Sequence, residues 1–194
     1  MINRYLRLCL ILLVIFLSAC HSKKYTVRGP NGQAVAIKRP YEIEKPKREI
    51  AEKYAEIMGV KRSDIKNGKL YSFIDDWYGT PYRFGGLNKD GVDCSGLVVA
   101  LQSEVFNTTL PRTCAMQVSV IKRKYEEDLK EGDLVFFDFD GKEFSHVGVY
   151  LQNGYIVHAS TRKGVIIVRL HDNGIYQYFS RGGSIMDTTS AQSN

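Results

Sequence analysis

The chain has 194 residues, of which 44% are hydrophobic and 25% are charged. This length suits one domain with a substantial core plus a short appendage, and the hydrophobic content excludes a disordered chain. The formal net charge is +6, but residues 20–50 carry eight Lys/Arg against three Asp/Glu, so the positive excess lies near the N-terminus. Because the remaining chain shows no basic stripe, nucleic-acid binding is not expected.

Residues 1–19 are typical of an export signal. Two arginines precede an apolar run over residues 8–17, and small residues follow it. Ten helical residues rise only about 15 Å, half of a hydrocarbon core, so the run is short for a membrane span. The stretch Leu17-Ser18-Ala19-Cys20 resembles a bacterial lipobox, which implies cleavage before Cys20 and lipid on its sulfur. The alternative is an ordinary secretory signal in which Cys20 has no role.

The next residues predict a tether. Residues 20–47 hold three prolines, two glycines and many charges without an apolar period, so we expect a lipid anchor at Cys20 followed by a flexible basic segment. The folded domain is expected over residues 48–187 and a disordered tail over residues 188–194. Lipid on Cys20 predicts attachment to a membrane of the cell envelope. His21 in place of Asp suggests the periplasmic face of the outer membrane, by analogy with enteric bacteria.

Helices are predicted in the first half of the domain. Apolar residues at three- and four-residue spacing favour helices over 49–58, ended by Gly59, and over 70–78. The expected apolar positions of these two helices are Ile50, Tyr54, Ile57, Met58, Leu70, Phe73, Ile74 and Trp77. A glycine-rich loop then leads to a helix over 97–106, and a further helical stretch is expected from Pro111 to about Tyr125.

Strands are predicted in the second half. Four short runs rich in β-branched and aromatic residues are separated by turns that contain glycine. They cover residues 133–139, 146–151, 155–160 and 165–170. Helices followed by an antiparallel meander indicate an α+β domain.

Cys94 is the candidate nucleophile. It lies at the mouth of the helix over 97–106, with Asp93 as a candidate N-cap. A helix N-terminus and a neighbouring imidazolium both lower the pKa of a thiol, and the thiolate is the reactive form. Among the four histidines, His146 and His158 lie on adjacent predicted strands and are the candidate partners.

The register of this hairpin decides whether the two histidines can cooperate. If Asn153-Gly154 formed a two-residue turn, the numbers of paired residues would sum to 307 and the histidines would face opposite sides of the sheet. If the residue numbers of each pair sum to an even number, both histidines face the same side of the sheet. A sum of 306 places the two histidines diagonally, and a sum of 304 places them directly opposite each other. A functional pair therefore predicts an odd-length loop or a bulge. His146 would then be the base for Cys94, and His158 would hold the second ring nitrogen of His146.

A series of sequence blocks occurs in order within roughly residues 70–185. The blocks are Trp77-Tyr78-Gly79-Thr80-Pro81-Tyr82-Arg83-Phe84-Gly85-Gly86, Asp93-Cys94-Ser95-Gly96-Leu97-Val98, Leu110-Pro111-Arg112-Thr113 with Gln117, Gly132-Asp133-Leu134-Val135-Phe136-Phe137, His146-Val147-Gly148-Val149-Tyr150 and Val157-His158-Ala159-Ser160. In this order the blocks resemble the NlpC/P60 family of cell-wall peptidases, in particular its lipoprotein endopeptidases.

The resemblance implies a papain-like fold and a cysteine peptidase that hydrolyses amide bonds in peptidoglycan stem peptides or crosslinks. It assigns the nucleophile to Cys94, the base to His146 and the orienting residue to His158. It also places Tyr82 near the oxyanion and substrate. Asp93 and Ser95 match positions that contact the stem peptide in some members, and that bind its free amine in γ-D-glutamyl-L-diamino-acid endopeptidases. Arg112 and Gln117 match family blocks, and Arg112 is expected to shape its loop.

Alternatives remain open at this point. Cys114 stands where the family usually has a small hydroxyl residue, so it is either a small core residue or a second thiol able to form a disulfide with Cys94. Cys94, His146 and His158 could instead bind Zn²⁺, although a fourth ligand is not evident. The chain could also be a non-catalytic wall-binding lipoprotein. We expect no cofactor, a monomer, and peptidoglycan peptides as the partner, with the cleaved amide undetermined.

Overall fold

Helices come first along the chain and a sheet follows, as the sequence predicts. The computed structural model describes residues 37–38 and 41–186. The export signal, Cys20, most of the predicted tether and the predicted tail lie outside these residues. The principal helices of the described part are α2 (Arg48–Met58), α3 (Gly68–Trp77), α4 (Cys94–Phe106), α5 (Cys114–Val118) and α6 (Asn173–Tyr176). Three 3-10 turns also occur, at Arg62–Asp64, Glu126–Asp128 and Phe139–Gly141.

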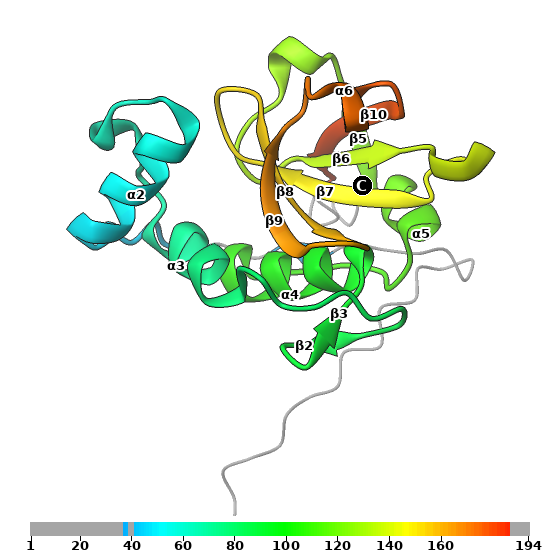
Figure 1. Cartoon of the computed structure of the whole chain (residues 1–194), viewed down its shortest axis with the longest axis horizontal. Helices are drawn as coiled ribbons and strands as arrows, with labels where there is room; N and C mark the ends of the chain where they lie inside the picture. Colours follow the sequence, from blue (N-terminus) through cyan, green and yellow to red (C-terminus); the bar gives the residue numbers. More distant parts are fainter. Residues whose placement is uncertain (1–36, 39–40, 187–194) are drawn as a thin grey trace, which may run out of the picture.

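The main sheet has six antiparallel strands in the order β5-β10-β6-β7-β8-β9. Figure 1 shows α4 running below this sheet, between it and a small hairpin of β2 (Leu87–Asn88) and β3 (Gly91–Val92). The predicted α+β class with an antiparallel meander is confirmed, because β6 to β9 pair in chain order. The strands of the main sheet are β5 (Ile121–Lys124), β6 (Leu134–Phe137), β7 (His146–Tyr150), β8 (Tyr155–Ser160), β9 (Gly164–Arg169) and β10 (Phe179–Ile185).

The first helix follows its prediction closely. Gly59, with φ of +65°, ends α2 in the left-handed conformation that glycine adopts without strain. One detail of its predicted apolar face is wrong, because Ile57 is 38% exposed. The buried face is instead built around Tyr54 and Met58 together with two alanines.

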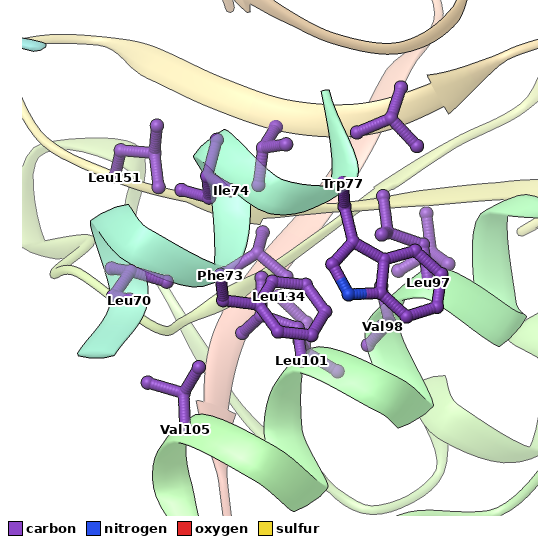
Figure 2. Packing of buried hydrophobic residues seen from close by; sticks show 14 of the residues in the cluster. Leu70, Phe73, Ile74, Trp77, Leu97, Val98, Leu101, Val105, Leu134 and Leu151 are labelled. Carbon is purple, nitrogen blue, oxygen red and sulfur yellow. The ribbon is translucent and has the colours of Figure 1, made fainter. Parts of the chain in front are cut away.

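The next two helices pack on each other and on the sheet. Figure 2 shows Phe73 and Trp77 of α3 beside Leu97, Val98 and Leu101 of α4. The rings of Phe73 and Trp77 stack with centroids 5.1 Å apart. Burial of such side chains contributes about 1.5–3 kcal/mol each, so this contact holds α3 firmly against α4.

The region after Pro111 differs from the prediction. The helical stretch expected to run to Tyr125 is wrong, because α5 ends at Val118 and β5 follows it as an edge strand paired with β10. The sequence of β5, with three basic residues in a row, lacks strand alternation, and its ladder to β10 overrides the local helix preference. Strand β10 itself was not predicted.

The N-terminal segment contacts the domain where it is described. Strand β1 (Ile37–Lys38) pairs with β4 (Thr108–Thr109), which directly follows α4. The ring of Tyr41 packs edge-on against Phe106 with centroids 5.1 Å apart. A further small hairpin joins β2 (Leu87–Asn88) to β3 (Gly91–Val92). Among the described helices, none is long and apolar enough to cross a membrane.

Candidate active site

Cys94 is the first residue of α4, and the cap of this helix is unusually well connected. The Asp93 carboxylate accepts from the N–H of Gly96 at 2.7 Å, so the predicted N-cap is confirmed. It also accepts from the N–H of Gly85 at 2.8 Å and from two Arg112 nitrogens at 2.7 and 3.0 Å. Burial alone would raise the pKa of Asp93, but these hydrogen bonds outweigh it and hold the pKa below its usual value.

Arg112 ties together the residues around the cap. Besides Asp93, its guanidinium donates to the Ser95 hydroxyl at 2.9 Å and to the Gly86 carbonyl at 3.3 Å. Ser95 also donates to Asp93 at 3.2 Å. The predicted loop-shaping role of Arg112 therefore has a structural basis. Every oxygen of the Asp93 carboxylate is already engaged by donors of the protein.

The hairpin of β7 and β8 has an even register. Val149 pairs with Val157 and Tyr150 with Ile156, so the paired numbers sum to 306. Leu151 continues this register, because its N–H donates to the Tyr155 carbonyl at 2.8 Å, so residues 152–154 form a three-residue turn. In this turn Asn153 and Gly154 have φ of 52° and 74°. The odd-length loop and even register that a functional pair would require are therefore present. Both histidines lie diagonally on one side of the sheet.

The two histidines bond to each other. His146 Nε2 lies 2.8 Å from His158 Nδ1, and both side chains are buried. The pKa of His158 is lowered to about 3, mainly by burial and secondly by its neighbour His146. His158 is therefore neutral, and its Nδ1 can accept the Nε2–H of His146. This bond leaves Nδ1 of His146 as the ring nitrogen available to Cys94.

Two neighbours favour the thiolate of Cys94. Its pKa is lowered first by a hydrogen bond with Cys114 and then by the hydrogen bond and charge of His146, which together outweigh burial. The sulfur atoms of Cys94 and Cys114 are 3.6 Å apart. The pKa of Cys114 is raised by the same contact and by burial. Because only Cys94 also has His146 and the N-terminus of a long helix, Cys94 is the thiolate and Cys114 the donor.

Tyr82 is held near Cys94 by backbone contacts. It forms a bridge with Val92, and the N–H of Arg83 donates to the Val92 carbonyl at 3.1 Å. Burial, and next the negative charge of Cys94, raise the pKa of Tyr82 to about 12. The phenol therefore keeps its proton and can donate a hydrogen bond. The N–H of Cys94 is a further donor, because the first N–H groups of a helix have no intrahelical acceptor.

Gly148 is a residue of the site whose importance the sequence analysis missed. By the register of the hairpin, it lies opposite His158, and a Cβ on it would come within 3.3 Å of the His158 Cβ. The sequence could have revealed this role, because Gly148 lies between His146 and Tyr150 on the strand face that both histidines share.

Gln117 is fully buried and donates to the carbonyls of Ser95 and Pro111, so it supports the loop that contains Pro111.

The arrangement does not suit a zinc ion. His146 and His158 direct one nitrogen each at the other, so they cannot both offer these nitrogens to a metal. Within the described part of the chain, no group of three or more His, Cys, Asp or Glu is placed to hold a metal ion. The geometry instead joins a thiol, an imidazole and an orienting acceptor, which is an arrangement for nucleophilic catalysis.

Comparison with known proteins agrees with this geometry. The model of the NlpC/P60 family matches residues 79–183, which include Tyr82, Cys94, His146 and His158. The chain belongs to the NlpC/P60 family. The resemblance found in the sequence is thereby confirmed.

Relatives within the NlpC/P60 family are substantially similar to this chain. The probable endopeptidase NlpC of Escherichia coli K12 is 44% identical over 105 residues, which is 54% of this chain and 68% of the relative. The murein DD-endopeptidase MepS/murein LD-carboxypeptidase of the same strain is 40% identical over 113 residues, 58% of this chain and 59% of the relative. A crystal structure of an NlpC/P60 family protein from Bacillus cereus has a TM-score of 0.55 at 26% identity, covering 60% of this chain and 39% of that one.

Proposed function

We propose that the protein is a cysteine peptidase that hydrolyses amide bonds in the peptides of peptidoglycan. One observation carries the proposal: the thiol at the N-terminus of α4 lies beside His146, whose second nitrogen is 2.8 Å from His158. The family and its endopeptidase relatives supply the substrate class. A wall-binding protein without activity would have no need for this complete set of reactive groups.

The mechanism is acyl transfer. The Cys94 thiolate attacks the carbonyl carbon, and the N–H of Cys94 and the hydroxyl of Tyr82 stabilise the resulting oxyanion. His146 protonates the leaving amine and then takes a proton from the water that hydrolyses the thioester. His158 remains neutral and keeps the His146 ring oriented through Nε2.

Replacement of the nucleophile tests this function. The Cys94→Ala variant should release no peptides from purified sacculi, whereas the wild type does, and circular dichroism should show that both are folded. A variant at the exposed His171, His171→Ala, serves as a matched histidine control and should remain active. Digestion by Cys94→Ala at the wild-type rate would overturn the proposal.

The pairing of Asp93 with Arg112 favours one kind of substrate. A receptor for a free amine needs an available negative charge, but the Asp93 carboxylate is saturated and its charge is balanced by Arg112. We therefore favour cleavage of crosslinks, whose stem peptides have no free N-terminal amine, over cleavage of free stem peptides. This specificity agrees with the name of the MepS relative.

Mass spectrometry of muropeptides distinguishes the two specificities. Crosslinked dimers should be converted to monomers, while a free tripeptide that starts with L-Ala should be cleaved slowly. Arg112→Gln should reduce the preference for crosslinked dimers over the free tripeptide, because it leaves the negative charge of Asp93 without its positive partner. Rapid cleavage of the free tripeptide by the wild type would contradict the proposed specificity.

We also propose that a lipid on Cys20 anchors the protein in the cell envelope, at the periplasmic face of the outer membrane. The lipobox-like stretch before Cys20 and the short apolar run support this proposal. Membrane fractionation tests it: Cys20→Ser should shift the protein out of the membrane fraction and abolish labelling by a fatty acid. Unchanged fractionation of the variant would argue against the anchor.

A further inference from the structure

Cys114 is a second thiol in direct contact with the nucleophile. Its sulfur lies 3.6 Å from that of Cys94, and both residues are buried. The two belong to different helices, since Cys94 begins α4 and Cys114 begins α5. Both are free thiols, and acyl transfer as derived above uses only one of them. An inert core cysteine would need no alignment with another sulfur.

The geometry is close to that of a disulfide. A bond between the two sulfurs has a length of about 2.05 Å, so they must approach by roughly 1.5 Å. Side-chain rotation can supply part of this movement, and α5 is a helix of only five residues. Contacts around Cys94, including the cap of Asp93 and the packing of Leu97, hold α4 in place. We therefore expect α5 to adjust rather than α4.

We propose that Cys94 and Cys114 form a modification site for peroxides, at which oxidation joins the two sulfurs and reversibly blocks the peptidase. The inference rests on the proposed function only for its effect on activity. The thiolate of Cys94 attacks one oxygen of the peroxide, which forms a sulfenic acid and, after protonation, releases water or an alcohol. The Cys114 sulfur then attacks the Cys94 sulfur. The S–O bond breaks, the S–S bond forms, and hydroxide leaves with the Cys114 proton as a second water.

The overall reaction is a two-electron oxidation of the two thiols by the peroxide. The two thiols together lose two electrons and two protons, and the peroxide is reduced by the same two electrons. The disulfide removes the nucleophile from the site and protects it from further oxidation to the sulfinic acid, which thiols do not reverse. A small-molecule thiol restores both cysteines by exchange.

Peptide mapping of the purified full chain after hydrogen peroxide treatment tests the site without reference to activity. The wild type should yield a Cys94–Cys114 linked peptide, with a mass about 2 Da below the sum of the reduced peptides. Cys114→Ser keeps a hydroxyl that can donate to Cys94 but cannot form the bond. Its Cys94 peptide should instead gain about 32 Da through formation of the sulfinic acid.

Activity gives the second readout, with each protein compared with its own fully reduced form. Peroxide should reduce wild-type activity at least tenfold and dithiothreitol should restore it, whereas the loss in Cys114→Ser should be irreversible. Oxidation of Cys94 to sulfinic acid at equal rates in both proteins, without the linked peptide, would overturn the inference. A linked peptide in a protein without peptidase activity would instead refute the proposed function and leave the modification site standing.

Discussion

A single hydrogen bond orients the ring of His146. Its Nε2 lies 2.8 Å from His158 Nδ1, in a buried environment where a rotated ring would leave polar atoms without partners. In the proposed reaction, His158 thus acts through His146 and is a positioning residue. The absence of charge on His158 means that orientation, and not the stabilisation of a full ion pair, is its main contribution.

Removal of His158 should therefore affect turnover more than binding. His158→Ala should lower kcat about 100-fold with little change in KM, because misplaced catalytic groups cost about this much. His158→Asn should recover much of the loss, since its amide oxygen can accept from Nε2. Steady-state kinetics on a crosslinked muropeptide measure both values. Equal losses in the Ala and Asn variants would show that His158 does more than accept a hydrogen bond.

Cys114 should also influence the titration of Cys94. The hydrogen bond from Cys114 is the largest cause of the lowered pKa of Cys94, so its loss raises that pKa and reduces the thiolate fraction at mildly acidic pH. In Cys114→Ala the pH midpoint of alkylation by iodoacetamide should rise by about one to two units, because a hydrogen bond to a charged group is worth about 1.5–3 kcal/mol and one pKa unit corresponds to about 1.4 kcal/mol. Cys114→Ser should lie closer to the wild type. Identical profiles for all three proteins would contradict this role.

At the scale of elements, the cap of α4 links stability to pH. The lowered pKa of Asp93 means that its contribution is fully present above the pKa of an unfolded Asp and is lost as the pH falls through the folded value. Asp93→Asn should therefore reduce the free energy of unfolding by about 2 kcal/mol at pH 7.

This difference should begin to shrink as the pH falls below about 4, where the unfolded Asp takes up a proton, and it should disappear as the pH falls through the lowered pKa of folded Asp93. Urea unfolding at several pH values measures it. Asp90→Asn, at an exposed position in the β2–β3 turn, is the matched control and should leave stability unchanged. A constant difference between pH 7 and pH 3 would show that charge is not the cause.

The hairpin of β7 and β8 has little room beside its histidines. In Gly148→Ala the new Cβ would lie 3.0 Å from the Val157 carbonyl and 3.3 Å from the His158 Cβ, so the histidine must shift by a few tenths of an ångström. We expect activity to fall about tenfold while the melting temperature changes little. Gly174→Ala, where a Cβ meets no atom within 4 Å, should have neither effect. A large fall in melting temperature with normal activity per folded molecule would contradict this view.

At the scale of the whole molecule, local pattern predicted the elements that carry the site, but not the contacts between them. The helix at Cys94, the strands of His146 and His158 and their turn are all visible as runs and breakers in the sequence. The alternation of apolar residues along 146–151 did not decide the register of the hairpin. One face of this strand is apolar, but the other holds His146 and Gly148 and could face either way. The distance between Cys94 and Cys114 depends on how α4 and α5 pack, which no local pattern contains.

Strand β10 was not predicted from the sequence because it contains two glycines. Gly182 and Gly183 weaken the strand pattern, yet a Cβ at Gly182 would lie 2.8 Å from the Leu129 side chain and one at Gly183 would lie 2.3 Å from the Lys122 carbonyl. The same glycines that hide this strand in the sequence are required for its central place between β5 and β6. The prediction of a helix up to Tyr125 failed for the same reason, since β5 exists as a strand only beside β10.

Removal of the N-terminal segment tests how far the domain extends. A chain that begins at Tyr41 loses the two residue pairs of β1 and β4, so its free energy of unfolding should fall by about 1–2 kcal/mol. The slope of this free energy against urea concentration should not change. A chain that begins at Ala36 keeps these pairs and is the control. A loss above about 4 kcal/mol would indicate that β1 belongs to the cooperative core.

The β1–β4 ladder also determines where a mechanical load enters the domain. A pull on the chain N-terminal to Ile37 acts first on two residue pairs at Thr108 and Thr109, before it reaches α2 or the sheet. Thr109 lies three residues before Arg112, so this load is applied at the base of the loop that carries Arg112 and leads into α5 at Cys114. If the protein is held by its N-terminus while it binds a stretched wall, tension would be felt beside the nucleophile itself.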